Sequence, residues 1–368
     1  MPLDPSNPTA ADAPSAPTPP RPPRRPRYSG THPRKFQEKY KELNPDRFPD
    51  VAAKIAESGK TPAGSHRPIC VDEILNLLQP APGMVGIDAT LGFGGHARAL
   101  LERIQPNGKL LGVDTDIHQL PRTEARLRAL GYGPDQLITA HTNYAGIPKV
   151  LASLQTGRAD FVLADLGCSS MQLDDPERGF SFKTGGPLDM RMNPEKGPSA
   201  AAWLATVRED RLRSALEENG DEPHAAKIAA TLCRARQTHP LTTTKDLRRL
   251  ICEALQDTDG RIRTAKDPAV EPSIRRVFQA VRIAVNDEFS ALTTFLRNLP
   301  EILRPGGRVG ILTFHSGEDR RVKHAFKEGL QAGLYAKIAE DVIRPSREEI
   351  HTNPRAASAK LRWALRSP

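Results

Sequence analysis

Short apolar runs and amphipathic stretches alternate along most of the chain. Each apolar run ends at a polar residue or a glycine, as a buried strand does, and the stretches that follow place apolar residues every three or four positions, as helices do. The runs at 84–89 and 110–114 are followed by expected helices at 96–104 and 122–130. Three further strands are expected at 136–141, 160–166 and 308–314. This order predicts an α/β fold in which helices cover both faces of a parallel sheet.

The interval between the last two of these strands is too long for a single crossover connection. It contains four stretches with helical periodicity, at 200–219, 223–236, 244–256 and 274–298. We therefore expect an inserted helical domain at 171–275, which separates a first part of the sheet domain (61–170) from a second part (276–368).

The amino-terminal part differs in composition from the rest of the chain. Of the 34 prolines, ten fall within 1–27 together with four arginines, and such a segment cannot bury enough apolar surface to offset the entropy of ordering it. Residues 32–60 mix both signs of charge at spacings that suit a surface helix. We assign 1–60 to a disordered Pro- and Arg-rich tail and a mixed-charge extension.

Charge, hydropathy and cysteine content narrow the classes of function. A net charge of +9 favours a polyanionic partner. The mean hydropathy of −0.50 and the lack of a long apolar run exclude a membrane span. The four cysteines form no C-x-x-C pair, so we expect no metal site and no disulfide framework, but reduced thiols in a cytoplasmic protein.

A glycine-rich turn follows the first strand. Gly92, Gly94 and Gly95 lie between that strand and the next helix, where a ligand can approach the backbone closely. The second strand ends in Asp114, and a carboxylate at that place accepts hydrogen bonds from ribose hydroxyls. A plain structural turn, NAD and S-adenosylmethionine all stay open at this point, because both cofactors carry an adenosine ribose.

The ends of the next two strands favour S-adenosylmethionine. Tyr144 offers a flat face on which an adenine could stack, although an ordinary half-buried tyrosine fits the pattern too. The fourth strand ends in Asp165, followed by Ser169 and Gln172. NAD enzymes usually carry apolar or hydroxyl groups at this edge, whereas S-adenosylmethionine enzymes commonly carry an acidic or polar residue facing the methyl group. The pattern therefore favours a methyltransferase.

Longer motifs resemble those of the RsmH (MraW) family, bacterial methyltransferases that act on a cytosine N4 in 16S ribosomal RNA. They lie at 165–174, 176–182, 186–192, 277–288 and 314–320, in the family's order and spacing. The resemblance implies a Rossmann-like, class I S-adenosylmethionine-dependent methyltransferase with an inserted helical substrate-recognition domain. It also implies cytidine 1402 of the decoding centre as the target, in 16S rRNA within the small ribosomal subunit. A homodimer is left open.

The resemblance also assigns roles to individual residues. The family's cofactor contacts fall on Gly94, Gly95, His96, Asp114, Tyr144, Asp165 and Gln172. For the group that aligns the cytosine amine with the methyl group, Asp165 is the first candidate and Ser169 the second, and the competing interpretation is that Asp165 only holds the cofactor. The substrate-binding candidates, each of which could instead be structural, are Arg178, Arg191, His315 and Arg320.

Two other classes of function fit parts of the sequence. An oxidoreductase could use the same glycine-rich turn with NAD, and a non-catalytic RNA-binding protein could retain a methyltransferase fold. Because ligand binding stabilises the folded state, a rise in melting temperature with S-adenosylmethionine but not with NAD separates the first alternative from a methyltransferase.

Overall fold

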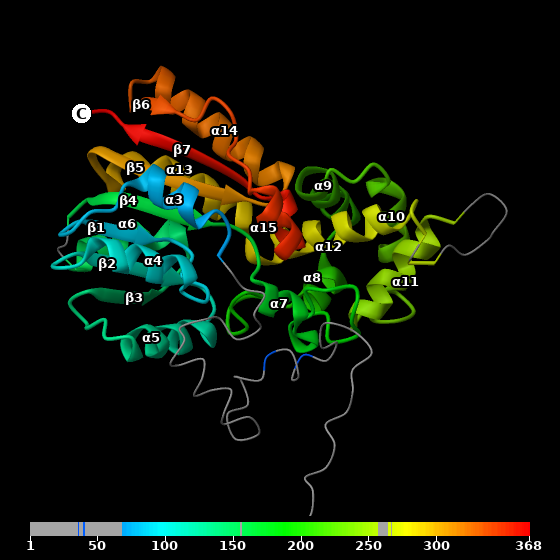
Figure 1. Ribbon diagram of the computed structural model, residues 1–368. Coiled ribbons are helices and arrows are strands. Elements are labelled where there is room, and N and C mark those ends of the chain that lie inside the picture. The colour runs from blue at the N-terminus through cyan, green and yellow to red at the C-terminus, as the bar shows by residue number, and fades with distance from the viewer. Residues whose placement is uncertain (1–35, 37–39, 41–67, 155–156, 257–263, 266) are drawn as a thin grey trace, which may run out of the picture.

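The computed structural model describes residues 36, 40, 68–154, 157–256, 264–265 and 267–368 (Figure 1). Within them the central sheet has seven strands in the order β3-β2-β1-β4-β5-β7-β6. The strands are β1 (Val85–Asp88), β2 (Lys109–Asp114), β3 (Leu137–His141), β4 (Ala159–Asp165), β5 (Leu303–Thr313), β6 (Tyr335–Ile338) and β7 (Lys360–Arg366). Strands β1 to β5 run parallel, and β7 is antiparallel to both of its neighbours. The five predicted strands are thus confirmed.

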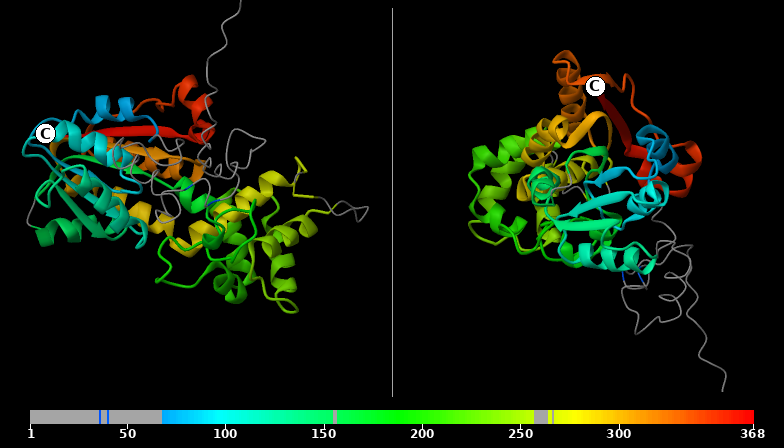
Figure 2. Two further views of the ribbon diagram at one scale, coloured as in Figure 1. Left: turned by 60° about the horizontal axis from the view of Figure 1, so that its bottom comes forward. Right: turned by 90° about the vertical axis from the view of Figure 1, so that its left-hand side faces the viewer.

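Helices cover both faces of the sheet, so that its strands are buried on two sides (Figure 2). One face packs on α3 (Val71–Leu78), α4 (Gly95–Ile104) and α5 (Gln119–Ala129). The other packs on α6 (Ile147–Leu154), α13 (Glu288–Ile302) and α14 (Ser316–Gln331). The strand order reverses between β1 and β4, and at such a reversal the connections leave a crevice at the carboxyl ends of the strands. The fold is the Rossmann-like class that the sequence predicted.

The chain between β4 and β5 contributes a separate group of helices beyond the carboxyl ends of the parallel strands (Figures 1 and 2). They are α7 (Ser170–Asp174), the 3-10 turn η3 (Pro176–Arg178), α8 (Ala200–Thr206), α9 (Glu209–Gly220), α10 (Ala225–Ala235), α11 (Thr244–Ala254) and α12 (Glu271–Asn286). From α8 onwards these helices bury their apolar faces in a core of their own, which includes Leu216, Ile228, Leu247 and Val277. The segment 186–192 contributes Leu188 and Met190 to it.

Two predicted helices are broken. The stretch 200–219 is interrupted because Val207 and Arg208 are extended, and 274–298 is divided at Asp287, whose φ of 50° ends α12 and starts α13 in a new direction. The apolar periodicity runs through both breaks, so it did not reveal them.

Several elements were not predicted from the pattern. They include α3, α6, α14, β6, β7, α15 (Arg347–Thr352) and the 3-10 turns η2 (Tyr144–Gly146) and η4 (Pro354–Ser358). Strand β7 lies between β5 and β6 although it follows β6 in the sequence. None of the helices in the described part of the chain has the length and apolar character needed to span a bilayer. The predicted tail and extension, 1–60, lie outside the described residues except for Phe36 and Tyr40.

Candidate active site

Three aspartates end three adjacent strands. Asp88 ends β1, Asp114 ends β2 and Asp165 ends β4, and because β1 lies between the other two, the three carboxylates share one edge of the sheet. The strand order reverses at this edge, which is where open α/β sheets bind their ligands.

The glycine-rich turn connects β1 to α4 at the same edge. Gly94 has a φ of 73°, and a Cβ placed on it would lie 2.8 Å from Cγ2 of Thr123, so the turn needs glycine for its conformation and for its packing against α5. The amide of Gly92 donates to Oδ2 of Asp114 over 2.7 Å. Helix α4 begins at Gly95, so its first amides have no acceptor within the helix. The turn thus offers backbone donors beside the aspartates.

Asp165 and His96 form the centre of the site. The Nε2 atom of His96 lies 3.0 Å from the carbonyl oxygen of Ile69, and its Nδ1 lies 3.7 Å from Oδ2 of Asp165. Burial lowers the pKa of His96, so the ring is neutral, with Nε2 donating to Ile69 and Nδ1 left as an acceptor. Burial, helped by the charge of Glu318, raises the pKa of Asp165 to about 7. Its Oδ1 is buried and has no hydrogen-bond partner among the described residues.

Asp88 belongs to the same centre, although the sequence analysis gave it no role. Its Oδ1 accepts from the amide of Thr90 over 3.1 Å, whereas its buried Oδ2 has no partner in the described part of the chain. Burial raises the pKa of Asp88 to about 6, against the opposing influence of His96. Its place at the end of β1, next to β4, is the signal that could have identified it.

Asp114 and Asp116 follow β2 with different surroundings. Asp114 accepts from the amides of Gly92 and Asp116, and burial raises its pKa. Asp116 is also buried, but the charge and hydrogen bond of Arg178, together with the hydrogen bonds from Gln172 and Gln119, outweigh that burial and lower its pKa. Its Oδ2 accepts from Nη1 of Arg178 over 2.8 Å and from Nε2 of Gln172 over 2.9 Å. Asp116, which the sequence analysis missed, thus connects the end of β2 to the residues after β4.

Ser169 and Gln172 cap the start of α7. The Oγ of Ser169 accepts from the amide of Gln172, and Oε1 of Gln172 accepts from the amide of Ser169 over 2.9 Å. Both side chains are therefore engaged within the protein, with Gln172 bonded to Asp116 as well. The ring of Tyr144 packs on Phe295 with 5.3 Å between centroids, and burial raises its pKa.

Of the four substrate-binding candidates, two arginines are engaged inside the protein. Besides its bond to Asp116, Arg178 donates Nη2 to the carbonyl oxygens of Arg191 and Met192. Arg191 forms a two-pronged pair with Asp189 and donates to the carbonyl of Gly197.

The other two candidates lie at α14. Arg320 pairs with Asp221 over 2.7 Å and keeps 53% of its side chain exposed. His315 caps α14, because its Nδ1 accepts from the amide of Glu318 over 3.4 Å, and its Nε2 lies 3.1 Å from Oε1 of the same residue. All four side chains thus have partners in the protein.

A buried ion pair joins the helical group to the sheet. Nε and Nη2 of Arg282, on α12, donate to the two carboxylate oxygens of Glu288, the first residue of α13, over 2.8 and 2.9 Å. Nearby, Asn286 accepts from the amide of Met192 and donates to the carbonyl of Met190. These residues hold the segment 186–192 against the break between α12 and α13.

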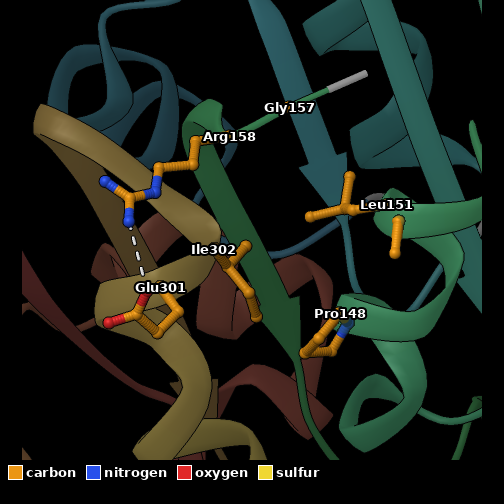
Figure 3. A pocket seen from close by; sticks show the side chains of 7 residues that line it. Pro148, Leu151, Gly157, Arg158, Glu301 and Ile302 are labelled. Carbon is orange, nitrogen blue, oxygen red and sulfur yellow. Dashed lines mark hydrogen bonds and ion pairs between the residues drawn. The ribbon is translucent and has the colours of Figure 1, made fainter. Parts of the chain in front are cut away.

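A hollow of about 420 Å³ lies elsewhere, between α6, the end of α13 and the start of β4 (Figure 3). Pro148, Leu151 and Ile302 give it an apolar lining, and the ion pair between Arg158 and Glu301 lies at its rim. Arg158 precedes β4 and Asp165 ends it, so seven residues of strand separate the hollow from the aspartates, about 20 Å. The hollow is not part of the site.

The aspartate edge fits the cofactor expected from the sequence. S-adenosylmethionine carries an ammonium group, a sulfonium charge and two ribose hydroxyls, and buried acceptors without partners require such donors or positive charge. Asp88 and Asp165 each offer one such oxygen, and Asp114 lies at the position suited to the ribose. Among the described residues, no cluster of His, Cys, Asp or Glu has the arrangement of a metal site.

Comparisons with known proteins agree with one another. The model of the MraW methylase family matches residues 63–367. The chain is 51% identical over 342 residues to the ribosomal RNA small subunit methyltransferase H 2 of Alkaliphilus metalliredigens. The alignment covers 93% of this chain and 97% of that protein. It is 48% identical to the ribosomal RNA small subunit methyltransferase H 1 of Lachnoclostridium phytofermentans, and that alignment covers 93% of this chain and 92% of the relative. It is 40% identical to the ribosomal RNA small subunit methyltransferase H of Thioalkalivibrio sulfidiphilus, and that alignment covers 84% of this chain and 99% of the relative.

Proposed function

The chain belongs to the MraW methylase family, and we propose that it methylates the exocyclic N4 of a cytidine in 16S ribosomal RNA, with cytidine 1402 as the specific target. The observation that carries this proposal is the buried, unpartnered Oδ1 of Asp165 at the end of β4, beside the neutral ring of His96. One unpartnered oxygen on Asp165 suits an amine that must be held in one orientation.

The cofactor is S-adenosylmethionine, which supplies an electrophilic methyl group when it is bound. We assign its binding to the residues of the aspartate edge and its neighbours: Asp88, Gly94, Gly95, His96, Asp114, Tyr144, Asp165 and Gln172. Asp88 and Asp165 complement its positive charge, and Asp114 accepts from its ribose hydroxyls. Gln172 acts indirectly, because its amide group holds Asp116 and Ser169 in place.

Asp165 compensates for the weakness of the nucleophile. The lone pair of a cytosine amine is delocalised into the ring, so the amine must be aligned and its developing positive charge stabilised. We assign Oδ1 of Asp165 to accept one N–H of this amine. As the N–CH₃ bond forms and the S–CH₃ bond breaks, the nitrogen must lose a proton, and a carboxylate with a pKa near 7 is suited to take it.

Ser169 is the weaker candidate for this role. Its Oγ already accepts the amide of Gln172, which uses one of its two lone pairs and fixes the side chain as the cap of α7. A neutral hydroxyl also stabilises a developing positive charge less than a carboxylate does. The interpretation that Asp165 only holds the cofactor differs in its kinetic consequence, because it predicts a loss in binding and not in turnover.

We place RNA recognition on the helical group and on the segment 174–195, within the predicted inserted domain at 171–275. A base in folded RNA must leave its stack to reach an acceptor at the edge of a sheet. Because Arg178 and Arg191 are engaged internally, we assign them to shaping this segment, and exposed Lys183 is the better candidate for a phosphate contact. The partner proposed is 16S rRNA in the small subunit.

The test is methylation of small-subunit particles and of free 16S rRNA, both isolated from a strain that lacks this gene. Mass spectrometry of RNA fragments and nucleosides should find N4-methylcytidine at one site, formed at least about a hundredfold more slowly with the Asp165→Asn variant. A methyl group on a ring carbon or a ribose would contradict the proposal, and labelling of free RNA alone would exclude the assembled subunit as the substrate.

A further inference from the structure

Tyr40 lies far outside the matched family region, yet it is completely buried in the folded protein. Its side chain has no exposed surface, and its ring lies against Phe36 with 4.8 Å between centroids. Its hydroxyl donates to Oδ2 of Asp174, the last residue of α7, over 2.7 Å. A partly buried hydrogen bond to a charged acceptor over 134 positions of sequence is a specific attachment.

Asp174 joins three distant parts of the chain. Oδ2 accepts from Tyr40, and Oδ1 accepts from Nη2 of Arg355 in η4 over 2.7 Å. Each carboxylate oxygen thus receives a donor from a different end of the chain. Because the carboxylate belongs to α7, these bonds fix the carboxyl-terminal end of that helix.

Helix α7 needs such attachments to hold its position. It has only five residues, and a helix of that length is not stable by itself in water. Its first turn is held by the mutual capping of Ser169 and Gln172 and by the bond from Gln172 to Asp116. The bonds of Asp174 hold the other end. The segment from Asp165 to Asp174 is therefore fixed at both of its ends.

The relatives differ in how much of the amino-terminal extension their alignments include. The alignment with the Alkaliphilus relative covers 93% of this chain and leaves only about 26 residues unmatched, so it includes residue 40. The family model begins at residue 63, and the Thioalkalivibrio relative is matched over 99% of its own length while covering only 84% of this chain. The extension is thus shared with some relatives, and the Thioalkalivibrio protein has no room for most of it.

We propose that Tyr40 is a positioning residue for methyl transfer, which acts through Asp174 to hold α7 and the segment that carries Asp165 and Ser169. The inference rests on the proposed function for its effect on turnover, whereas the attachment itself does not. A tyrosine that served only to attach the extension would contribute to stability and leave turnover at saturation unchanged.

The first experiment measures single-turnover methylation of small-subunit particles at saturating S-adenosylmethionine by full-length variants. We expect Tyr40→Phe, which removes only the hydroxyl, to lower the rate about tenfold, because small misplacements of reacting groups cost up to about a hundredfold. Asp174→Asn should lower it at least as much, and the double variant should be no slower than Asp174→Asn. Tyr132→Phe, in the turn after α5, is the matched control and should keep the full rate.

The second measurement does not depend on activity. Amide hydrogen exchange should accelerate within 169–175 in Tyr40→Phe and stay unchanged in α5. A full single-turnover rate for Tyr40→Phe, or losses that multiply in the double variant, would overturn the positioning role. Unchanged exchange at 169–175 would overturn the attachment itself. Should the wild-type enzyme fail to methylate the particles while exchange still responds to Tyr40→Phe, the proposed function would be wrong and the attachment right.

Discussion

The aspartate edge and the joint between α12 and α13 are both rich in buried polar groups, but they satisfy those groups differently. At the edge, Asp88 and Asp165 each keep one buried oxygen without a partner among the described residues. At the joint, Arg282 and Glu288 satisfy each other through two hydrogen bonds, and Asn286 bonds to the backbone of Met190 and Met192.

This difference separates a binding site from a structural contact. An unsatisfied buried polar group costs about 1–3 kcal/mol, a cost that a bound ligand with suitable donors removes. In a hydrogen-bonded ion pair this cost is absent, but the loss of one partner leaves the charge of the other buried without a partner. Substitutions at the joint should therefore lower the free energy of unfolding, and substitutions at the edge should lower the rate of methyl transfer.

The largest expected effect is on the stability of the joint. Arg282→Met should lower the free energy of unfolding by about 3–5 kcal/mol, because Glu288 then stays buried without its partner. Urea unfolding of the purified protein measures this loss. The double variant Arg282→Met with Glu288→Leu should recover most of it, and equal stability of the single variant and the wild type would contradict the assignment.

At the edge, Asp165→Asn should reduce turnover about 100- to 1000-fold while changing the affinity for S-adenosylmethionine much less, because the lost charge is needed mainly as the amine reacts. Single-turnover rates at saturating cofactor, together with calorimetric dissociation constants, separate the two effects. Near-normal transfer at saturation would assign Asp165 to holding the cofactor and move the acceptor role to Ser169.

Asp114→Ala tests the cofactor half of the edge. Removal of an acceptor for the ribose hydroxyls should weaken S-adenosylmethionine binding by about 1–3 kcal/mol. It also leaves the amides of Gly92 and Asp116 without their acceptor, so the melting temperature of the free protein should fall as well. An unaltered dissociation constant would remove Asp114 from the site.

The pH dependence of the reaction should reflect the raised pKa of Asp165. Its ionised form is the acceptor, so kcat/KM should rise about tenfold from pH 6 to pH 8, through the pKa of about 7, with a smaller contribution from Asp88 near pH 6. Asp165→Asn should abolish the upper part of this rise. The same raised pKa makes the free protein less stable as pH increases from about 4 to 7, since the folded state binds the proton more tightly than the unfolded state.

The smallest effect is expected at Arg320, which is more than half exposed. Its pair with Asp221 should contribute less than about 1 kcal/mol, so Arg320→Ala should leave stability nearly intact. A fall of about one in the salt-dependence slope of RNA binding would nevertheless reveal a phosphate contact. An unchanged slope would confine Arg320 to bracing α9 against α14.

The sequence was sufficient to predict the framework of the edge but not the state of its side chains. The apolar runs located β1 to β5, and Asp114 and Asp165 followed directly from the ends of β2 and β4, whereas Asp88 at the end of β1 was given no role. Which arginines are available to bind RNA was not predictable, because the partners of Arg178 are an aspartate 62 positions away and two carbonyl oxygens. Asp287 was missed since its left-handed backbone leaves no mark in the apolar periodicity. Tyr40 was missed since its neighbours in sequence are charged.

The place of β7 between β5 and β6 has a consequence for the order in which the molecule assembles during its synthesis. Translation delivers β6 before β7, its one neighbour among the described strands, so β6 cannot join the sheet until residues 360–366 have been made. Arg355 is also made late, and the junction at Asp174 is incomplete until it arrives. The ribosome that translates this chain therefore has to complete nearly all of it before β6 and β7 can join the sheet and both bonds of Asp174 can form.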